Sequence, residues 1–171
     1  MGLPDPLTRL PSRVLLGDRL GDASNKGIRE GSFFALMFMD LDGFKTVNDA
    51  YGHDVGDRLL IAVTERLLQP LKGQYTLARI GGDEFVLLAE VNAPDEAATL
   101  ADALVRTIDQ PFTLDRYDLV VTLSVGIALY PHDGKNEREL MFNADAAMYH
   151  TKHMGRNGYH FFQPSMNTLA Q

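Results

Sequence analysis

The sequence predicts one α/β (α+β) domain in which helices flank a central, mostly antiparallel sheet. A continuous apolar run at residues 33–41 (FFALMFMDL) indicates a strand buried on both faces. The runs YTLARI and DEFVLLAE indicate two more strands, and only Gly81-Gly82 separates them, which is typical of a tight hairpin. Segments with helical spacing interleave with these strands, which favours a layer-packed domain.

Amphipathic patterns predict four helices, each with apolar residues on one side. They cover residues 11–21, 54–68, 94–109 and 137–152. Pro11 stands at a position that helices accept near their start, and Gly155 suits the cap after the last helix. A polar, glycine-containing stretch at about 22–32 follows the first of these helices.

The second half of the chain is expected to add further strands. A hairpin is predicted over roughly 111–130, with DLVVTLSVGIALY as its long strand, and YHFF at 159–162 fits a last strand. The 171 residues are enough for one domain with a sizeable core. No apolar run approaches the length of a membrane span, and the N-terminus lacks the apolar core of a secretory signal.

Charge and composition narrow the classes of partner. The formal net charge is -7, and an acidic surface disfavours a sequence-independent binder of nucleic acid. A phosphorylated small ligand stays compatible, because local lysines, arginines and metal ions hold phosphates inside acidic proteins. The chain has no cysteine, which excludes disulfides and thiolate sites and fits a reducing compartment. We therefore expect a cytoplasmic domain that contacts neither nucleic acid nor membrane; any membrane anchor would belong to another segment of a longer protein.

Two carboxylates stand at unusual places, at the end of the buried strand and at the hairpin tip. If strand and hairpin are neighbours, Asp40 and Asp83 converge, and two oxygen ligands suit Mg²⁺ bound together with substrate phosphates. The alternative is that these acids are ordinary turn and cap residues in water. Gly81 and Gly82 also have two interpretations. They are common in any tight hairpin, and without side chains they would also let a nucleotide approach the backbone closely.

Several ordered motifs resemble those of the GGDEF family of diguanylate cyclases. The clearest is Arg79-Ile80-Gly81-Gly82-Asp83-Glu84-Phe85, which matches the family signature. Other blocks match in order along nearly the whole chain: residues 5–11 (DPLTRLP), 40–45 (DLDGFK), 48–53 (NDAYGH), 56–57 (GD), 123–128 (LSVGIA), 144–149 (ADAAMY), Lys152 and 155–157 (GRN). One short motif would be weak support, whereas this ordered set is specific.

The resemblance implies a palm-like fold, similar to that of class III nucleotidyl cyclases, and the conversion of two GTP into cyclic di-GMP and two pyrophosphates. Each subunit of a homodimer would hold one GTP, with Mg²⁺, or Mn²⁺ in its place, as the cofactor. Asp40, Asp83 and the Leu41 carbonyl would bind metal, with Asp40, Asp83 and Glu84 as the catalytic acids. A GTP-binding regulatory module that controls an attached EAL phosphodiesterase domain is the alternative function.

The resemblance also implies a set of substrate-binding residues. Asn48 and Asp57 would recognise guanine, which suits the donors and acceptors of their side chains. Asp57 has a structural alternative, because Asp54-x-x-Asp57 is also typical of a capped helix start. His53 is nearly as typical of a structural turn, and an isolated surface lysine is usually solvated. The full expected set is Phe44, Lys45, Asn48, His53, Asp57, Gly81, Gly82, Lys152 and Arg156.

Two departures concern regulation and chain length. The family's inhibitory product site, R-x-x-D, corresponds here to Lys72-Gly73-Gln74-Tyr75, so no such site is expected. Residues 162–167 (FQPSMN) resemble the junction into an EAL domain. We therefore expect residues 1–171 to be a single GGDEF domain cut from a longer protein, with residues 1–10 as a lead-in and residues 163–171 as the start of a linker to a further domain.

Overall fold

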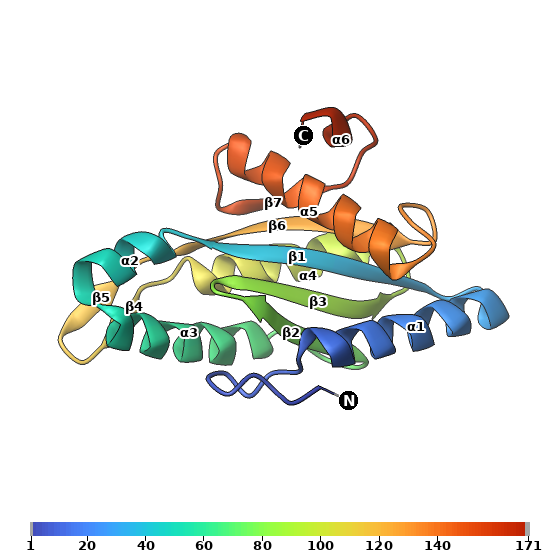
Figure 1. Ribbon diagram of the computed structural model, residues 1–171. Coiled ribbons are helices and arrows are strands. Elements are labelled where there is room, and N and C mark those ends of the chain that lie inside the picture. The colour runs from blue at the N-terminus through green and yellow to red at the C-terminus, as the bar shows by residue number, and fades with distance from the viewer. Residues whose placement is uncertain (1, 170–171) are drawn as a thin grey trace.

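The computed structural model describes residues 2–169, and its centre is a five-stranded sheet in the order β2-β3-β1-β6-β7 (Figure 1). Strand β7 runs parallel to β6, and all other neighbours are antiparallel. The mostly antiparallel sheet is therefore confirmed. The strands are β1 (Phe33–Asp42), β2 (Tyr75–Gly81), β3 (Glu84–Val91), β6 (Thr122–Tyr130) and β7 (Gly158–Phe161).

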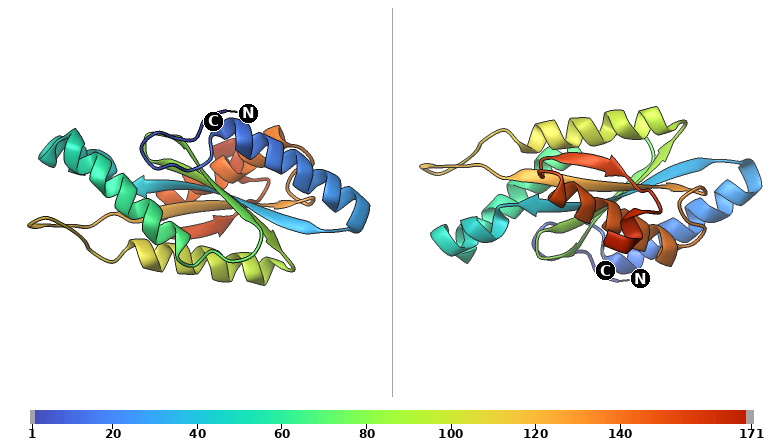
Figure 2. Two further views of the ribbon diagram at one scale, coloured as in Figure 1. Left: turned by 90° about the horizontal axis from the view of Figure 1, so that it is seen from below. Right: turned by 90° about the horizontal axis from the view of Figure 1, so that it is seen from above.

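Helices cover both faces of this sheet. Helices α3 and α4 pack on one face and α1 and α5 on the other, and α6 lies on the far side of α5 (Figures 1 and 2). In the described residues no helix is both long enough and apolar enough to cross a membrane. The helices are α1 (Arg13–Glu30), α2 (Phe44–Tyr51), α3 (His53–Leu68), α4 (Pro94–Ile108), α5 (Glu137–His153) and α6 (Met166–Leu169).

Strand β1 is buried on both faces, as predicted, and its alternation places the candidate acids. Met37 and Met39 face the α3/α4 side, whereas Phe34, Leu36 and Phe38 face the α1/α5 side. Since side chains alternate along a strand, Asp40 and Asp42 continue the second set. Both carboxylates therefore lie on the sheet face that α1 and α5 cover, where they interrupt the apolar row formed by Phe34, Leu36 and Phe38.

Helix α1 is longer than the predicted 11–21 and includes most of the polar stretch at 22–32. Only Leu16 and Leu20 contribute large buried side chains, so the apolar signal ends early. The helix nevertheless continues along the sheet, because Gly27 lets it approach the ring of Tyr130, where a Cβ atom would lie 2.5 Å from Cε2. A left-handed cap at Gly31 then ends it (φ 67°).

The hairpin between β2 and β3 turns one residue later than predicted. Gly81 is still paired with Glu84, so the turn residues are Gly82 and Asp83, and only Gly82 has a positive φ (30°). A register shift between Arg79 and Gly81 accompanies this change. Consequently Asp83 sits at the tip of the hairpin itself.

The predicted long hairpin over 111–130 is wrong. Strands β4 (Phe112–Leu114) and β5 (Tyr117–Leu119) form a separate small hairpin that turns at Asp115 (φ 54°). The apolar run then breaks at the exposed Val120, and β6 pairs with β1 instead. Hydrophobicity alone does not distinguish the small β4–β5 hairpin from β6, because both supply buried residues to the same core.

Helix α5 lies directly against β6 at Gly126. A Cβ atom there would overlap the carbonyl oxygen of Ala144 and the backbone nitrogen of Met148. The helix ends as predicted near Gly155: Arg156 N–H donates to Thr151 O at 3.0 Å, a bond typical of a Schellman cap. Of the expected lead-in and linker, residues 1, 170 and 171 lie outside the described residues.

Candidate active site

Pairing between β1 and β3 brings the two signature acids together. Asp40 stands opposite Glu84 in the register, and Leu41 N–H donates to the carbonyl oxygen of Asp83 at 3.2 Å. The tip of the hairpin is thus bonded to the end of the buried strand. The expectation that these two segments are neighbours is confirmed.

Burial, and in second place the charge of Asp40, disfavours the ionised forms of Asp83 and Glu84. Burial, and then the charge of Asp40, raise the pKa of Asp83 to about 6. Burial and the same Asp40 charge also raise the pKa of Glu84. Among the described residues Asp40 Oδ1 is buried and has no hydrogen-bond partner, while Oδ2 accepts from Lys152. A buried carboxylate oxygen without a donor favours a cation.

Sequence reasoning missed a further acid, Asp145 on α5. Burial and the charge of Asp40 raise the pKa of Asp145, which shows that it shares the electrostatic environment of the site. Asp145 precedes Lys152 by seven residues, which is about two helical turns, so both lie on one side of α5. That spacing was the signal available in the sequence.

The residues present fit a magnesium site completed by a substrate. The donors are carboxylate oxygens with a backbone carbonyl next to them, which suits a hard ion such as Mg²⁺. Within residues 2–169, no group of three or more His, Asp or Glu side chains is arranged to hold a metal by itself. A Mg²⁺ ion that keeps waters and takes phosphate oxygens needs no such cage.

Asp42 has a different role from Asp40, although both are buried at the end of β1. Its carboxylate accepts from the hydroxyls of Thr122 and Ser124 at 2.7 and 2.8 Å and from Asn157 N–H at 3.2 Å. Arg156 adds a longer contact of 3.5 Å. Asp42 is therefore saturated, and it fixes the segment after α5 in which Arg156 and Asn157 both adopt positive φ angles.

The side chain of Asn48 on α2 lies against Gly56 of α3, the residue before Asp57. A Cβ atom on Gly56 would overlap Asn48 Oδ1, an oxygen that is buried and has no partner among the described residues. The capping alternative for Asp57 is wrong, because α3 begins at His53 with Gly52 as its cap and no side-chain cap bond. Asp57 is left exposed one turn further on, next to Gly56.

Of the other expected substrate residues, Lys152 contacts Asp40, whereas Lys45, His53 and Phe44 have no described contact with Asp40. Lys45 is 90% exposed and pairs with Asp49 at 3.5 Å, and His53 is exposed at the start of α3. The Phe44 side chain is buried in the core, so only its backbone is available to a ligand. Gly81 and Gly82 are exposed at the hairpin tip, which leaves their backbone open to an approaching ligand.

The lead-in is bonded to the signature hairpin. Arg79 donates to both carboxylate oxygens of Asp5, at 3.0 and 3.2 Å, and to the carbonyl of Gly82 at 2.9 Å. Although burial opposes it, the bonds from Thr8 and Arg79 hold the pKa of Asp5 below its usual value. The turn that carries Asp83 is thus tied to the residues before α1.

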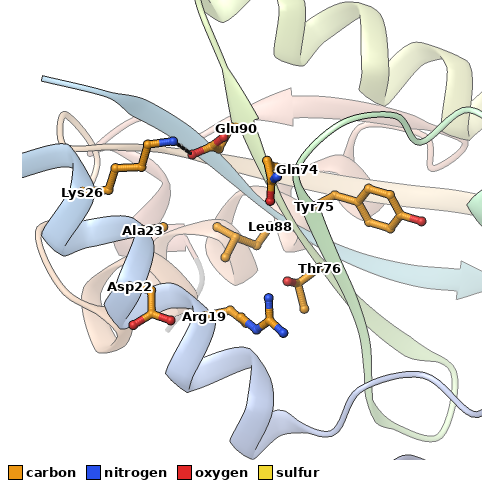
Figure 3. Close-up of a pocket in the computed structure, with 9 residues that line it drawn as sticks. All are labelled: Arg19, Asp22, Ala23, Lys26, Gln74, Tyr75, Thr76, Leu88 and Glu90. Atoms are coloured by element: carbon orange, nitrogen blue, oxygen red, sulfur yellow. Dashed lines mark hydrogen bonds and ion pairs between the residues drawn. The ribbon is translucent and has the colours of Figure 1, made fainter. Parts of the chain in front are cut away.

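Two cavities lie on the sheet face that α1 and α5 cover. One of 360 Å³ lies between α1 and β2, where Lys26 pairs with Glu90 at 2.8 Å and Tyr75 points away from the cavity (Figure 3). None of the expected metal or substrate residues lines it. A second cavity of 500 Å³ is lined by Glu84 and Asp145, so it opens beside the acids near the end of β1.

Comparison with known proteins places these features in a family. The model of the family described as "Diguanylate cyclase, GGDEF domain" matches residues 3–158. The chain is 57% identical over 171 residues to the bifunctional diguanylate cyclase/cyclic di-GMP phosphodiesterase MucR of Pseudomonas aeruginosa, covering 100% of this chain and 25% of MucR. It is 40% identical over 166 residues to the cyclic di-GMP phosphodiesterase NbdA of the same organism, covering 97% and 21%. The chain thus spans about a quarter or less of these relatives' length.

Solved structures agree with the fold. The GGDEF domain of TpbB from Pseudomonas aeruginosa has a TM-score of 0.95 at 32% identity and covers 98% of this chain and 99% of that one. The palm-like, α+β fold implied by the motifs is therefore confirmed. With a family match over residues 3–158 and acids placed as the signature implies, the chain belongs to the GGDEF family of diguanylate cyclase domains.

Proposed function

We propose that this domain is an active diguanylate cyclase that condenses two GTP molecules into cyclic di-GMP. The observation that carries this proposal is the Asp40–Asp83 pair: two adjacent carboxylates at strand ends, one with a buried oxygen that has no described partner. Such a pair is costly without a cation. A domain with only a structural role gains nothing from keeping it.

Asp40, Asp83 and the Leu41 carbonyl would hold two Mg²⁺ ions, whose chemistry there would be to lower the pKa of the 3′-hydroxyl and to offset the charge on the pyrophosphate. Asp83 is the residue that we propose accepts the proton of that hydroxyl. The first turn of α2 offers backbone N–H groups without helical partners, which with Lys45 suit the phosphates. Lys152 and Arg156 would neutralise further phosphate charge.

Guanine would lie where α2 meets α3, against Asn48 and Asp57. An ionised Asp accepts from the N–H donors of guanine, and the Asn amide both donates and accepts. Adenine has a different donor pattern and would leave these groups unpaired. His53, exposed at the start of the same helix as Asp57, would lie at the edge of this site.

The test is incubation of the purified protein with Mg²⁺ and GTP, followed by separation and mass analysis of the nucleotides. Cyclic di-GMP must form, and activity per subunit must rise steeply with protein concentration, because one site holds one GTP and the product needs two. Constant specific activity over a hundredfold dilution, with no dimer detected, would contradict the homodimeric mechanism. Repeating the assay with Mn²⁺ establishes which ion the site accepts.

The alternative function is a GTP-binding regulatory module without turnover. The relative NbdA is named as a cyclic di-GMP phosphodiesterase, so a GGDEF domain of this kind also occurs in a protein named for the opposite reaction. In this case GTP binds with Mg²⁺ but no product accumulates. The same assay therefore separates the two functions.

Asp57→Ala is expected to weaken GTP binding by roughly 1–3 kcal/mol, because hydrogen bonds to the base are lost. ATP binding should change little. Asp54→Ala, at an exposed position one turn earlier, is the matched control and should leave both affinities unchanged. Calorimetric titration with a non-hydrolysable analogue measures the change. Equal weakening of GTP and ATP binding would show that Asp57 does not contact the base.

Synthesis is expected to continue at micromolar cyclic di-GMP, with inhibition only by competition at the GTP site. Lys72 keeps a positive charge but lacks the forked contact of arginine, and Tyr75 offers a hydroxyl in place of an anionic acceptor. Two such losses, each roughly 1–3 kcal/mol, weaken a product site by about a hundredfold or more. The double variant Lys72→Arg/Tyr75→Asp should introduce non-competitive inhibition in steady-state assays. Tight non-competitive inhibition of the unmodified protein would contradict this prediction.

A further inference from the structure

Lys152 occupies a place that a metal ion would also need. Its ammonium group donates to Oδ2 of Asp40, and the two side chains are only 24% and 12% exposed. The other oxygen of Asp40 has no partner among the described residues. A single lysine therefore supplies the direct cationic contact to the carboxylate on which the proposed metal site depends.

The charge around this contact is unbalanced. Asp83, Glu84 and Asp145 all feel the charge of Asp40, and Lys152 is the cation that offsets it for each of them. Arg156 points instead to Asp42, which is already saturated. One positive charge thus faces four acids, so Lys152 lowers but does not cancel the negative charge that would attract a divalent ion.

A divalent ion and an ammonium group cannot both take the inner position at Asp40 without repelling each other. The lysine stem is long and flexible, and α5 holds its base one turn before the Arg156 segment. GTP phosphates would offer Lys152 a new anionic partner. Movement of the ammonium to a phosphate would then free Asp40 Oδ2 for the metal.

We propose that Lys152 is a stand-in cation that holds the metal position at Asp40 until nucleotide phosphates draw it away. The inference rests on the proposed function, since it concerns the same site. Its consequence is that metal and nucleotide bind synergistically, each strengthening the other by the same factor. Nucleotide-free protein would bind divalent metal weakly although its acids are already assembled.

The test is a titration with Mn²⁺ followed by electron paramagnetic resonance, with and without a non-hydrolysable GTP analogue. In Lys152→Met the nucleotide-free protein should bind Mn²⁺ about tenfold more tightly, and the tightening caused by the analogue should shrink by a similar factor. Lys152→Arg retains the charge and should bind Mn²⁺ without nucleotide as the unmodified protein does. Thermal unfolding checks that each variant is folded.

Lys45→Met is the matched control, since Lys45 is also a proposed phosphate ligand but pairs with Asp49 rather than with Asp40. It should leave nucleotide-free Mn²⁺ binding unchanged. Unchanged or weaker Mn²⁺ binding by folded Lys152→Met overturns the inference, even if the unmodified protein makes cyclic di-GMP. Tighter Mn²⁺ binding by Lys152→Met supports it even if no product forms, in which case the proposed activity alone fails. Absence of Mn²⁺ binding under every condition contradicts both.

Discussion

Asp83→Asn is expected to abolish the synthesis of cyclic di-GMP while making the metal-free protein more stable. The variant lacks one anionic metal ligand at the site of phosphoryl transfer. Its rate of synthesis should therefore fall by about 10³-fold or more. Product formation measured by mass detects this directly. The fold should survive, because the Asp83 contact to β1 is made by its backbone carbonyl and not by its side chain.

The gain in stability has a defined pH dependence. Folding raises the pKa of Asp83 from 3.8 to about 6, because burial and the Asp40 charge disfavour its ionised form. The folded state therefore binds the proton more tightly than the unfolded state, and stability is lost as pH rises from about 4 through 6. Asp83→Asn has no such loss, so it should be more stable by about 1 kcal/mol at neutral pH after allowance for solvent screening.

Thermal unfolding in the presence of a chelator, between pH 4 and pH 8, measures the effect. The difference between variant and unmodified protein should be present at pH 7 and disappear near pH 4. Asp22→Asn, an exposed acid on α1, is the matched control and should alter neither activity nor the pH profile. Near-normal synthesis by Asp83→Asn would remove Asp83 from the metal site, and an equal stability gain at all pH values would show that its charge is not the cause.

Gly126→Ala is expected to destabilise the protein by about 3 kcal/mol, because the added methyl group has no space. Its neighbours would be the Ala144 carbonyl and the Met148 nitrogen, which are backbone atoms of α5 and cannot turn aside as a side chain can. Relief requires α5 to move off the sheet, which also displaces Lys152 and Asp145. Chemical denaturation should therefore show reduced stability, and GTP binding should weaken in whatever fraction remains folded.

Gly21→Ala is the matched control for this substitution. Gly21 lies inside α1, and nothing approaches a Cβ atom at that position within 4 Å. Alanine should stabilise the helix there by roughly 0.5–1 kcal/mol. Opposite signs for the two glycine substitutions would confirm that the close approach of α5, and not glycine as such, determines the result. A neutral Gly126→Ala would mean that α5 adjusts freely.

The parts of the fold that the sequence predicted well are those where one physical signal dominates. Strand β1 is apolar on both faces, and α3, α4 and α5 carry regular apolar stripes, so their bounds differ from the predicted ranges by one residue at most. The proximity of Asp40 and Asp83 followed from a motif and a hairpin. In each case the local pattern and the tertiary environment agree.

The missed features depend on contacts between distant segments. Helix α1 continues past Gly27 because this glycine packs closely against the ring of Tyr130, about a hundred residues later in the chain. The eight-residue α2 was not predicted, since Phe44 and Val47 are its only buried residues. The exclusion of a cap role for Asp57 required knowing that α3 begins at His53, directly after the Gly52 cap. The isolation of Asp40 Oδ1 and its pairing with Lys152 leave no trace in local spacing.

The contact between Lys152 and Asp40 joins residues 112 positions apart, and it has a consequence for biosynthesis. During translation β1 emerges long before β6 and α5. The central strand can therefore pair with β6, and Asp40 with Lys152, only after those later segments have been made. Contacts of such long sequence separation slow folding, because the entropy of loop closure opposes them. A nascent chain that ends before α5 thus exposes the acids of β1 without any lysine beside them. Ribosome-bound chains should acquire nucleotide binding in one step, only when the last turn of α5 has left the exit tunnel.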